Sequence, residues 1–585
     1  MFYTVINIFF LVVAISLFFL QRSNYRFINT IKDTYKFSSK VNGNCRAEQT
    51  FSVFVEKNFY KLTVLLFLIT AFTSVFRLGE IPYGLNVDEA GMAYDAISLV
   101  NYGVDRYLKP YPVYFINFGG GQNAMYTYLS ALLINFFGYS PAIIRIPAVA
   151  LRLCSFIAIY FILKSDWKEH ACQHYDRTLI FLFLFSVCPY FIMQSRWGLE
   201  SNLLVGFFTI SICLLVYAIR NNDAKLFFVS GISFGLTLYT YALSYIIIPL
   251  FLFWLLIYLI SLKKVKLLQV FILSVPIVIL AVPLLLMILV NKGYVPEFQG
   301  IFTIPQLHFY RGDEVSFTNA IDNLYIFIAI LSFDNVRIFG DQLYFNAVPY
   351  FGTVYYFSIP FFVIGIISSF KKFMQSVKKR LFDLNIVFVL WFWSVIICQL
   401  LILYPNINKS NAVFVPVFCF ITEGIIRVFS SCKNAKAVVL VIIVCYLLNF
   451  SLFFNYYHTQ YNKDSKQFIL WATDYIDAVK FSKNLTANEI QVIKDITFEP
   501  YIYVLLENKI SPYHFSRNNI KIINDGFEQL YVFRPSDSLK AKISESNQNK
   551  GDCAYIVRNN EYWYNIFKDS GMQHKIFGNI CIYYK

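Results

Sequence analysis

Charged residues are scarce in this sequence of 585 residues. Asp, Glu, Lys and Arg together make up 15%, well below the roughly 25% that is usual in soluble domains. Glycine and proline are also few, at 24 and 18 residues, whereas 57% of the residues are hydrophobic. This composition excludes collagen, coiled-coil and disordered chains. A water-soluble protein has no surface on which to place so many apolar side chains, so the sequence predicts a polytopic membrane protein.

Motifs of several common enzyme classes are missing as well. The sequence contains no P-loop, no G-x-G-x-x-G and no G-x-S-x-G, which are the motifs of phosphate, dinucleotide and serine-hydrolase sites. The six His residues are scattered and no Cys/His cluster has zinc spacing, so no metal site is predicted. No internal repeat of the kind found in transporters is visible.

Twelve hydrophobic runs are near the length of about 20 residues that a membrane-spanning helix needs. They cover roughly residues 3–20, 62–78, 141–163, 179–194, 202–219, 226–242, 246–262, 267–289, 347–369, 382–403, 412–428 and 436–456. The expected fold is therefore an all-α polytopic membrane protein with about 12 transmembrane helices. The first run lacks a basic flank and a small-residue cleavage site, so we interpret it as an anchor rather than a signal peptide.

The net charge of +15 reports on topology. Loops 263–266 and 371–380 are basic, whereas loops 79–140 and 290–346 are net acidic, and the cytoplasmic loops of membrane proteins collect Lys and Arg. The segment 122–137 would invert this pattern if it crossed the membrane. We therefore predict that this segment is interfacial or re-entrant and that the N-terminus and the acidic loops are extracytoplasmic. The basic charge then gives no indication of nucleic acid.

The chain divides into three parts. Residues 1–61 form an anchor helix and a basic cytoplasmic linker, and residues 62–456 form the transmembrane domain. Residues 457–585 are more charged and are expected to form a small extracytoplasmic α/β domain, which is long enough for a core of its own.

Local patterns predict the elements of this C-terminal domain. The apolar stretches 501–506, 553–557 and 580–585 are typical of buried strands, and residues 465–481 and 559–570 are typical of helices. Most of the 11 Cys lie in hydrophobic segments, where they act as small apolar residues. Cys553 and Cys581 lie on two of the expected strands, and whether they form a disulfide is left open.

The segment 77–105, RLGEIPYGLNVDEAGMAYDAISLVNYGVD, is the most informative part of the chain. Asp88 and Glu89 lie a few residues beyond the predicted exit of the second membrane helix. Asn86 or Asp88 can cap a short helix that continues to Val100 and, being amphipathic, would lie on the membrane surface. A purely structural interpretation, with an N-cap and a first-turn acid, stays open.

Two further polar patches lie at the same predicted membrane face. In QSRWGLESN, Arg196 and Glu200 are four residues apart and would share one helical face, and ionisable groups near a membrane often mark function. In YPNINKSNAVFVP, Asn408 and Lys409 stand beside further amides. The alternatives are a simple ion pair for the first patch and an ordinary polar loop for the second.

Tyr239 and Tyr245 also lie at this face, although an aromatic belt at the membrane interface is a sufficient explanation for them. Carboxylates, cations and amides together suit a lipid phosphate that carries a polar group. A carboxylate can act as a general base on an acceptor hydroxyl. Arg or Lys can hold the phosphate and stabilise it as it leaves.

From Arg77 to Arg145 the sequence resembles the bacterial family 39 glycosyltransferases of the GT-C superfamily. These enzymes are relatives of the protein O-mannosyltransferases and of the aminoarabinose transferases that modify lipid A. The motifs that carry the resemblance are RLGEIPYGLNVDEA, GQNAMYTYLSALLINFFGYS and AIIRIPAVAL. SRWGLESN, DQLYFNAVPYFGTVYYFSIP and NINKSNAVFVP are also similar to the bacterial branch of this family. The resemblance covers roughly residues 60–456.

The resemblance implies a GT-C fold with interfacial helices in the first external loop. It also implies a transferase that uses a polyprenyl-phosphate sugar at the outer face of the plasma membrane. Asp88 would be the catalytic carboxylate, with Glu89 in support. Arg196 and Lys409 would bind the donor phosphate, and Glu200 would hold the sugar or the acceptor.

Asn408, Gln122, Tyr239 and Tyr245 complete the expected donor and acceptor site. Gln122 stands near the position where some relatives carry a Lys beside the lipid phosphate, which departs from the family pattern. The reaction would invert the anomeric centre by direct displacement, and a divalent metal takes part in some relatives. The acceptor would be an envelope glycan, lipid or protein, and the sequence identifies neither the acceptor nor the sugar. The alternatives are a polytopic lipid or polysaccharide transporter and an O-antigen polymerase or ligase.

Overall fold

The computed structural model describes most of the chain. The described residues are 6, 8–17, 46–165, 174–310, 312, 318–331, 348, 350–403, 405–432, 435–463, 471–515, 519–524, 527–545 and 553–585. The basic linker up to residue 45, residues 341–347 of a family-like motif and residues 465–470 of an expected helix lie outside this part.

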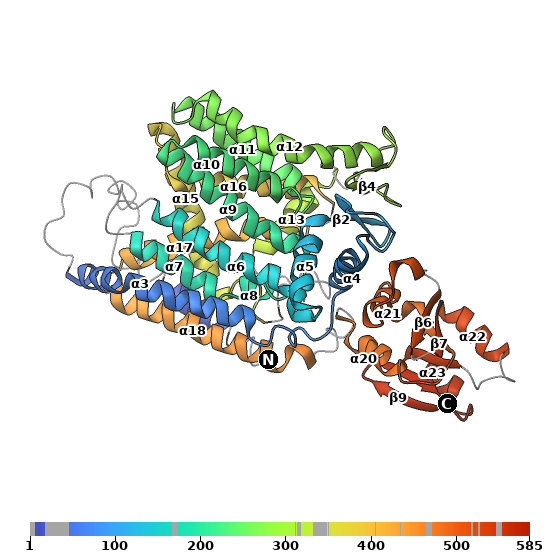
Figure 1. The fold of residues 1–585 in the computed structure, drawn as a ribbon. Coiled ribbons are helices and arrows are strands. Elements are labelled where there is room, and N and C mark those ends of the chain that lie inside the picture. The colour runs from blue at the N-terminus through green and yellow to red at the C-terminus, as the bar shows by residue number, and fades with distance from the viewer. Residues whose placement is uncertain are drawn as a thin grey trace.

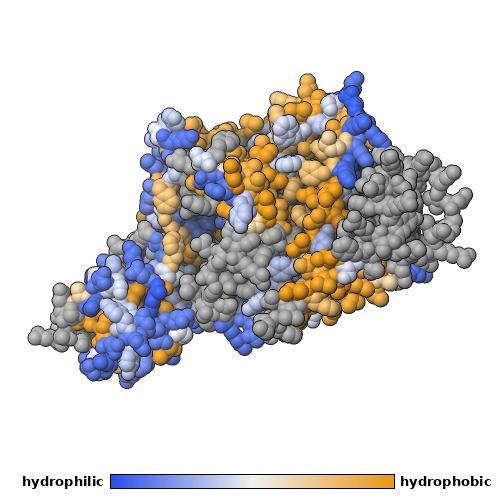
Figure 2. Space-filling view, turned by 180° about the vertical axis from the view of Figure 1, so that it is seen from behind, coloured by the Kyte–Doolittle hydropathy of each residue, from blue (hydrophilic) through white to orange (hydrophobic). Residues whose placement is uncertain are grey.

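Within the described residues, nine helices are long and apolar enough to cross a membrane. They are α3 (Arg46–Val75), α6 (Pro141–Lys164), α9 (Glu200–Asn221), α11 (Ser244–Ser261), α12 (Leu267–Asn291), α15 (Ile359–Lys379), α16 (Leu384–Leu401), α17 (Phe414–Ser430) and α18 (Ala435–Thr459). These helices form one bundle (Figure 1), and hydrophobic side chains cover much of its surface (Figure 2). The predicted all-α membrane architecture is confirmed.

Shorter helices complete this part of the molecule. They are α4 (Val87–Tyr102), α5 (Ala124–Phe137), α7 (His174–Val187), α8 (Pro189–Gln194), α10 (Ala224–Thr237) and α13 (Ala320–Leu331), together with an apolar helix at Ile8–Leu17. The predicted run 179–194 is split into α7 and α8, because the ring of Pro189 cannot continue the hydrogen bonds of α7. Helix α13 was not predicted, since its 12 residues are too few for a span.

Helix α17 lies at the centre of the bundle. In its membrane segment 89% of the residues are buried, against 22% in α12 at the periphery. The backbones of α17 and α15 touch, because a Cβ on Gly424 would lie 1.9 Å from the carbonyl oxygen of Phe361. A Cβ on Gly365 would lie 1.6 Å from the carbonyl oxygen of Phe420. Only glycine permits this approach, which is common between membrane helices.

The segment 122–137 forms the end of a hairpin and the helix that follows it. The hairpin consists of β1 (Tyr114–Asn117) and β2 (Gly120–Asn123), which pair in antiparallel fashion. Helix α5 has 14 residues, so it is about 21 Å long at 1.5 Å per residue. This is shorter than the hydrocarbon core of about 30 Å, and the interfacial or re-entrant position of the segment stays a prediction.

The C-terminal part is an α/β domain, as predicted. Its sheet has the strand order β6-β7-β5-β8-β10-β9, with β5 parallel to both β7 and β8. Its elements are α20 (Thr473–Ser482), β5 (Glu489–Ile493), α21 (Tyr501–Glu507), β6 (Asn519–Asn524), β7 (Phe527–Arg534), α22 (Ser536–Glu545), β8 (Cys553–Arg558), α23 (Glu561–Phe567), β9 (Gln573–Phe577) and β10 (Ile580–Tyr584). The expected strands at 553–557 and 580–585 are confirmed.

One expectation for this domain is wrong. The stretch 501–506 is the helix α21 rather than a strand. Its six residues are all buried, and a short apolar run that is buried on every side does not show which of the two structures it forms. The question left open for Cys553 and Cys581 is answered, since the two do not form a disulfide. In the sheet Cys581 lies opposite Val557, four residues along β8 from Cys553.

The α/β domain covers helix α4 (Figure 1). Tyr94 Oη donates a hydrogen bond to the carbonyl of Ile510 at 2.7 Å, and the amide of Leu85 donates to the carbonyl of Trp471 at 2.8 Å. Most of α4 is buried between this domain and α5. The C-terminal domain therefore packs on α4, and the position of α4 at the membrane surface stays a prediction.

Candidate active site

Asp88 lies in the first turn of α4, where the local sequence fixes the backbone. Asn86 is the N-cap, and its side chain accepts a hydrogen bond from the amide of Asp88 at 3.0 Å. Asn86 and Glu89 form a capping box, so the predicted cap at Asn86 is confirmed. Asn117, at the end of β1, donates to Asp88 Oδ1 at 3.1 Å. The helix N-terminus favours a negative charge here, and Asp88 stays half-buried.

Glu89 is fully buried and paired with Arg145 of α6. Arg145 Nε lies 2.8 Å from Glu89 Oε1, and Nη2 lies 3.0 Å from Oε2. The amide of Gly198 donates to Glu89 Oε1 at 2.8 Å, and Arg145 also donates to three backbone carbonyls of the loop 78–84. Glu89 is therefore enclosed by protein groups on the residue next to Asp88.

A second buried ion pair lies on the face of α4 that carries Asp88. Arg106 Nη2 is 2.7 Å from Asp95 Oδ2, and both side chains are at most 1% exposed. A Cβ on Gly91 would lie 2.7 Å from Asn117 Oδ1 and 2.8 Å from Arg106 Nη2. Asn117 and Arg106 therefore converge beside the helix face that carries Asp88. Arg106 Nη1 and Asn117 Oδ1 are buried without a hydrogen-bond partner among the described residues.

The sequence reasoning did not identify the Asp95–Arg106 pair. The signal was present in the spacing, since Asp88 and Asp95 are seven residues apart and share one face of a helix. Arg106, eleven residues beyond Asp95 and past the end of α4, could be assigned to that face only from the fold. The Arg106 guanidinium also lies over the ring of Phe118, 5.4 Å from its centroid.

Glu200 is the first residue of α9 and binds the hairpin. The backbone amide of Asn123 donates a hydrogen bond to Glu200. The side chain of Asn123 donates to the carbonyl of Leu238 at 3.1 Å and to Tyr245 Oη at 3.4 Å. These contacts join the start of α5, the start of α9 and the turn between α10 and α11. The structure thus brings Glu200 and Tyr245 together as expected.

Gln122 and Tyr239 lie beside this group. Gln122 is the residue before Asn123 on β2, and its side chain is 3% exposed with Oε1 unpartnered among the described residues. The carbonyl of Tyr239 accepts a hydrogen bond from the amide of Met125 at 3.1 Å. Tyr239 Oη donates to the carbonyl of Leu280 at 2.7 Å, so this hydroxyl ties α12 to the turn rather than reaching into the site.

Arg196 is placed differently from the expectation. It lies in the turn before α9, so Arg196 and Glu200 do not share a helical face. Its terminal nitrogens donate to five backbone carbonyls between residues 73 and 81, and its guanidinium lies 5.5 Å from the ring centroid of Tyr457. The side chain is fully buried. Arg196 closes the end of α3, which argues against the expected contact with a donor phosphate.

The loop before α17 reaches the start of α9. Asn411 Nδ2 lies 3.2 Å from Ser201 Oγ and 3.3 Å from Asn202 Oδ1, directly beside Glu200. Asn408 and Lys409 are half-buried in the same loop. Lys409 Nζ donates to the carbonyl of Leu403 at 2.7 Å. The sequence expectation that this loop belongs to the site agrees with its position.

Glu89 also connects the segments that carry the two other carboxylates, Asp88 and Glu200. Its hydrogen bond to Gly198 is two residues from Glu200, so the helix turn that carries Asp88 and the start of α9 are directly connected. A Cβ on Gly198 would lie 3.1 Å from Glu89 Cγ and 3.2 Å from Tyr126 Oη, which explains the glycine. Asp88 and Glu200 are therefore held at one end of the bundle by a rigid, buried network.

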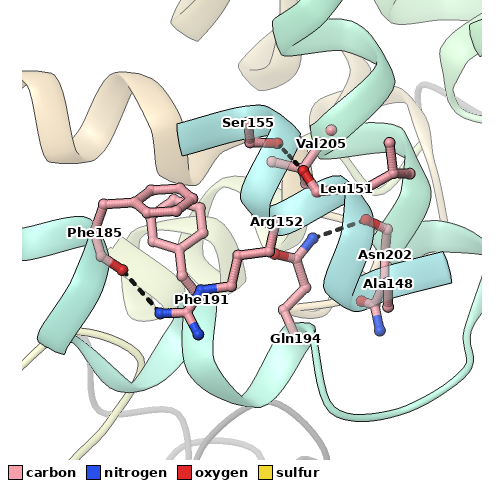
Figure 3. A pocket seen from close by; sticks show the side chains of 10 residues that line it. Ala148, Leu151, Arg152, Ser155, Phe185, Phe191, Gln194, Asn202 and Val205 are labelled. Atoms are coloured by element: carbon pink, nitrogen blue, oxygen red, sulfur yellow. Dashed lines mark hydrogen bonds between the residues drawn. The ribbon is translucent and has the colours of Figure 1, made fainter. Parts of the chain in front are cut away.

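A polar pocket lies just beneath the start of α9 (Figure 3). It is small, and its lining includes Arg152, Gln194 and Asn202. Gln194 Nε2 donates to the carbonyl of Asn202 at 2.9 Å, and Arg152 donates to the carbonyl of Phe185 at 3.2 Å. Neither Asp88 nor Glu200 lines this pocket. Among the described residues, no group of three or more His, Cys, Asp or Glu side chains could hold a metal.

The structure thus defines a multi-pass membrane protein with a polar, carboxylate-containing cluster at one end of its bundle, covered by an α/β domain. No protein-family model matches the sequence, and no curated protein sequence matches it. A solved structure similar to it is ArnT from Cupriavidus metallidurans bound to undecaprenyl phosphate. The TM-score is 0.51 at 9% identity, over 90% of this chain and 98% of that chain.

The oligosaccharyltransferase of Archaeoglobus fulgidus in complex with zinc and sulfate is also similar, with a TM-score of 0.44 and 12% identity. That match covers 76% of this chain and 61% of the oligosaccharyltransferase. At 9% identity, the likeness to ArnT shows a shared fold. The chain therefore has a fold like that of ArnT, in agreement with the membrane fold predicted from the sequence.

Proposed function

We propose that the protein is a membrane glycosyltransferase that moves a sugar from a polyprenyl-phosphate donor to a hydroxyl group of an envelope acceptor. The observation that carries this proposal is the position of Asp88, whose half-buried carboxylate is held by Asn117 at the start of α4. This position lies at one end of a GT-C bundle. ArnT has been solved with undecaprenyl phosphate bound, which supports a lipid-linked donor for this chain as well.

In the proposed reaction, the acceptor hydroxyl oxygen attacks the anomeric carbon of the donor sugar. The new C–O bond forms while the bond from that carbon to the phosphate oxygen breaks, and the electron pair of the broken bond leaves with the polyprenyl phosphate. Asp88 takes the proton of the hydroxyl. Attack opposite to the leaving phosphate inverts the anomeric centre. A phosphate leaves readily, so no second carboxylate is needed as an acid, unlike in glycosidases.

The donor phosphate needs positive charge and hydrogen-bond donors. We assign this role to Lys409, which lies in the loop beside the start of α9, with Asn408 next to it. Glu200 and Tyr245 would hold the sugar or the acceptor through the group they form with Asn123. Arg196 is not assigned to the phosphate, since its terminal nitrogens are taken by backbone carbonyls. The reaction side is proposed to be extracytoplasmic, on the charge distribution of the loops.

Mass spectrometry of envelope glycans tests this function in cells. We expect one glycan, lipid or glycoprotein species to lose a single sugar when the protein is absent. The wild-type chain should restore that species, and the variant Asp88→Asn should not, although it reaches the membrane in equal amounts. Asp569→Asn is the matched control, because Asp569 is an exposed carboxylate of the C-terminal domain. An unchanged envelope in the absence of the protein contradicts the proposal.

A further inference from the structure

The turn between β1 and β2 holds a phenylalanine in a strained backbone conformation. Phe118 and Gly119 join the two strands, and both have a positive φ, of 52° and 91°. A two-residue hairpin turn of this kind favours Asn-Gly, because most L side chains are strained in the left-handed region. Phenylalanine is therefore a poor choice for this position on local grounds. Strained residues cluster at functional sites, which makes the Phe118 side chain a candidate for a role in binding.

The ring of Phe118 lies beside the helix turn that carries Asp88. A Cβ on Gly91 would lie 3.4 Å from Phe118 Cζ. Gly91 follows Asp88 by three residues in α4, so the two lie on the same side of the helix. The residue before Phe118 is Asn117, which donates to Asp88 Oδ1 at 3.1 Å. The hairpin turn therefore belongs to the rim of the candidate active site.

The exposed partner of this ring belongs to the C-terminal domain. Phe498 contacts Phe118 edge to face, with the ring centroids 5.7 Å apart and the ring planes at 80°. Phe498 is 64% exposed. The next residue, Glu499, has a φ of 46°, so a second strained residue stands beside this aromatic pair. The pair connects the C-terminal domain to the rim of the Asp88 site and presents the ring of Phe498 to solvent.

An exposed aromatic ring beside a carboxylate suits a sugar. The C–H groups on one face of a pyranose ring carry a partial positive charge, whereas the face of an aromatic ring is negative, so the two stack. Both phenylalanines belong to the hairpin and the C-terminal domain rather than to the spanning helices, which argues against a lipid chain as the ligand. A single pair of rings is also small beside the roughly 800 Å² that each partner buries in a stable protein interface.

We propose that Phe498, supported by Phe118, binds a sugar ring of the acceptor, and that the acceptor is an envelope glycan. This inference rests on the proposed transferase function and names the class of its second substrate. The donor phosphate is assigned to Lys409 in the loop before α17, whereas the aromatic pair extends the site onto the C-terminal domain. The two substrates would thus be held by different parts of the chain, with Asp88 between them.

Nuclear magnetic resonance of the full-length protein in nanodiscs tests this proposal. The probe is the water-soluble glycan fraction that mild acid releases from the envelope of cells lacking the protein. The aromatic protons of the protein are saturated, and the saturation transferred to the sugar protons is followed in a titration that gives the Kd. We expect transfer with the wild type and with Phe498→Trp, which keeps an aromatic ring. Phe498→Leu keeps an apolar side chain without an aromatic face, and should weaken binding about two- to tenfold.

Tyr564→Leu is the matched control, because it removes an exposed ring from α23 of the same domain. Its Kd should equal that of the wild type. The absence of saturation transfer in the wild type overturns the proposal, and so does an equal Kd for the wild type and Phe498→Leu, the result expected of a lipid chain or a protein partner. The readout needs no sugar transfer. Glycan binding without any transfer would therefore contradict the proposed function alone, and transfer with unchanged binding in Phe498→Leu would contradict this inference alone.

Discussion

Arg145 Nε lies 2.8 Å from Glu89 Oε1, and both side chains are completely buried. This contact joins α6 to the first turn of α4, and through Gly198 it extends to the start of α9. Arg145 also lies 5.7 Å from the ring centroid of Trp471, at the boundary with the C-terminal domain. The Glu89–Arg145 ion pair therefore connects Glu89, the residue next to Asp88, to three parts of the molecule: α6, the start of α9 and the boundary with the C-terminal domain.

Removing either partner of this pair is expected to destabilise the whole site. Arg145→Gln leaves the Glu89 carboxylate buried without its cation, which costs about 3–5 kcal/mol. The measurement is the thermal unfolding of the purified protein in detergent, with Glu561→Gln as the control at an exposed position of α23. An Arg145→Gln variant that unfolds at the wild-type temperature would show that the pair does not hold the site together.

A second prediction concerns pH and Asp105, which follows α4. Burial, followed by the charge of Asp95, raises the pKa of Asp105 from 3.8 to about 7. The folded state therefore binds a proton that the unfolded state has released between these pH values. The stability that this proton provides is fully present below pH 3.8 and is lost as the pH rises through 7, by up to about 4 kcal/mol.

The variant Asp105→Asn tests this pH dependence. Its side-chain oxygen still accepts the hydrogen bonds from the amides of Tyr107 and Lys109, but it carries no charge. We expect the variant to be more stable than the wild type at pH 8 and to lose less stability between pH 5 and pH 8. The measurement is the melting temperature of each protein from pH 5 to pH 8. If the two melting temperatures change with pH by the same amount, Asp105 does not titrate in this range.

The contact between α15 and α17 gives a third prediction. Gly424→Ala places a methyl group where only 1.9 Å separates the Cβ position from the carbonyl oxygen of Phe361, so the two helices must move apart. Overpacking of this kind costs about 1–3 kcal/mol. Val282→Ile adds a carbon on the exposed face of α12 and should have no effect. Equal stability of the two variants, measured as loss of folded protein on heating in detergent, would contradict the close approach.

Lys409 and Arg196 were both expected to bind the donor phosphate, and the structure separates them. We expect Lys409→Gln to raise the KM for the polyprenyl-phosphate donor about tenfold or more, since a hydrogen bond to a charged group contributes about 1.5–3 kcal/mol. Arg196→Gln should instead lower the yield of folded protein, because five backbone carbonyls lose their donor. A KM unchanged in Lys409→Gln and raised in folded Arg196→Gln would reverse the assignment.

The sequence predicted the features that depend on local pattern. The apolar runs located the nine long helices, the cap at Asn86 follows from residue type, and a short apolar stretch identified the strand that starts at Cys553. Composition and spacing are sufficient to predict these features, because membrane insertion and helix capping depend on residues that are close together in the sequence. The acidic residues at 88 and 89 were also located, but the burial of Glu89 against Arg145 was not predicted.

What the sequence missed depends on contacts between distant segments. Arg196 was expected to share a helical face with Glu200 and to bind the donor phosphate. The carbonyls that bind it belong to the end of α3 and the turn after it, more than 100 residues earlier. Tyr501 begins a helix rather than a strand because it packs under α4. Arg106 contacts Asp95 because the chain turns back after the end of α4. The local pattern of the sequence does not indicate these contacts between distant segments.

The most direct test of the central claim is the transfer rate of the purified protein and of Asp88→Asn with a polyprenyl-phosphate sugar and its acceptor. The substitution keeps the size of the side chain and an oxygen that can accept from Asn117, so the fold should be intact by thermal unfolding. The account predicts that the kcat falls by about 10²–10⁴, the usual contribution of a general base, with the donor KM little changed. Asp88→Asn turnover at the wild-type rate would contradict it.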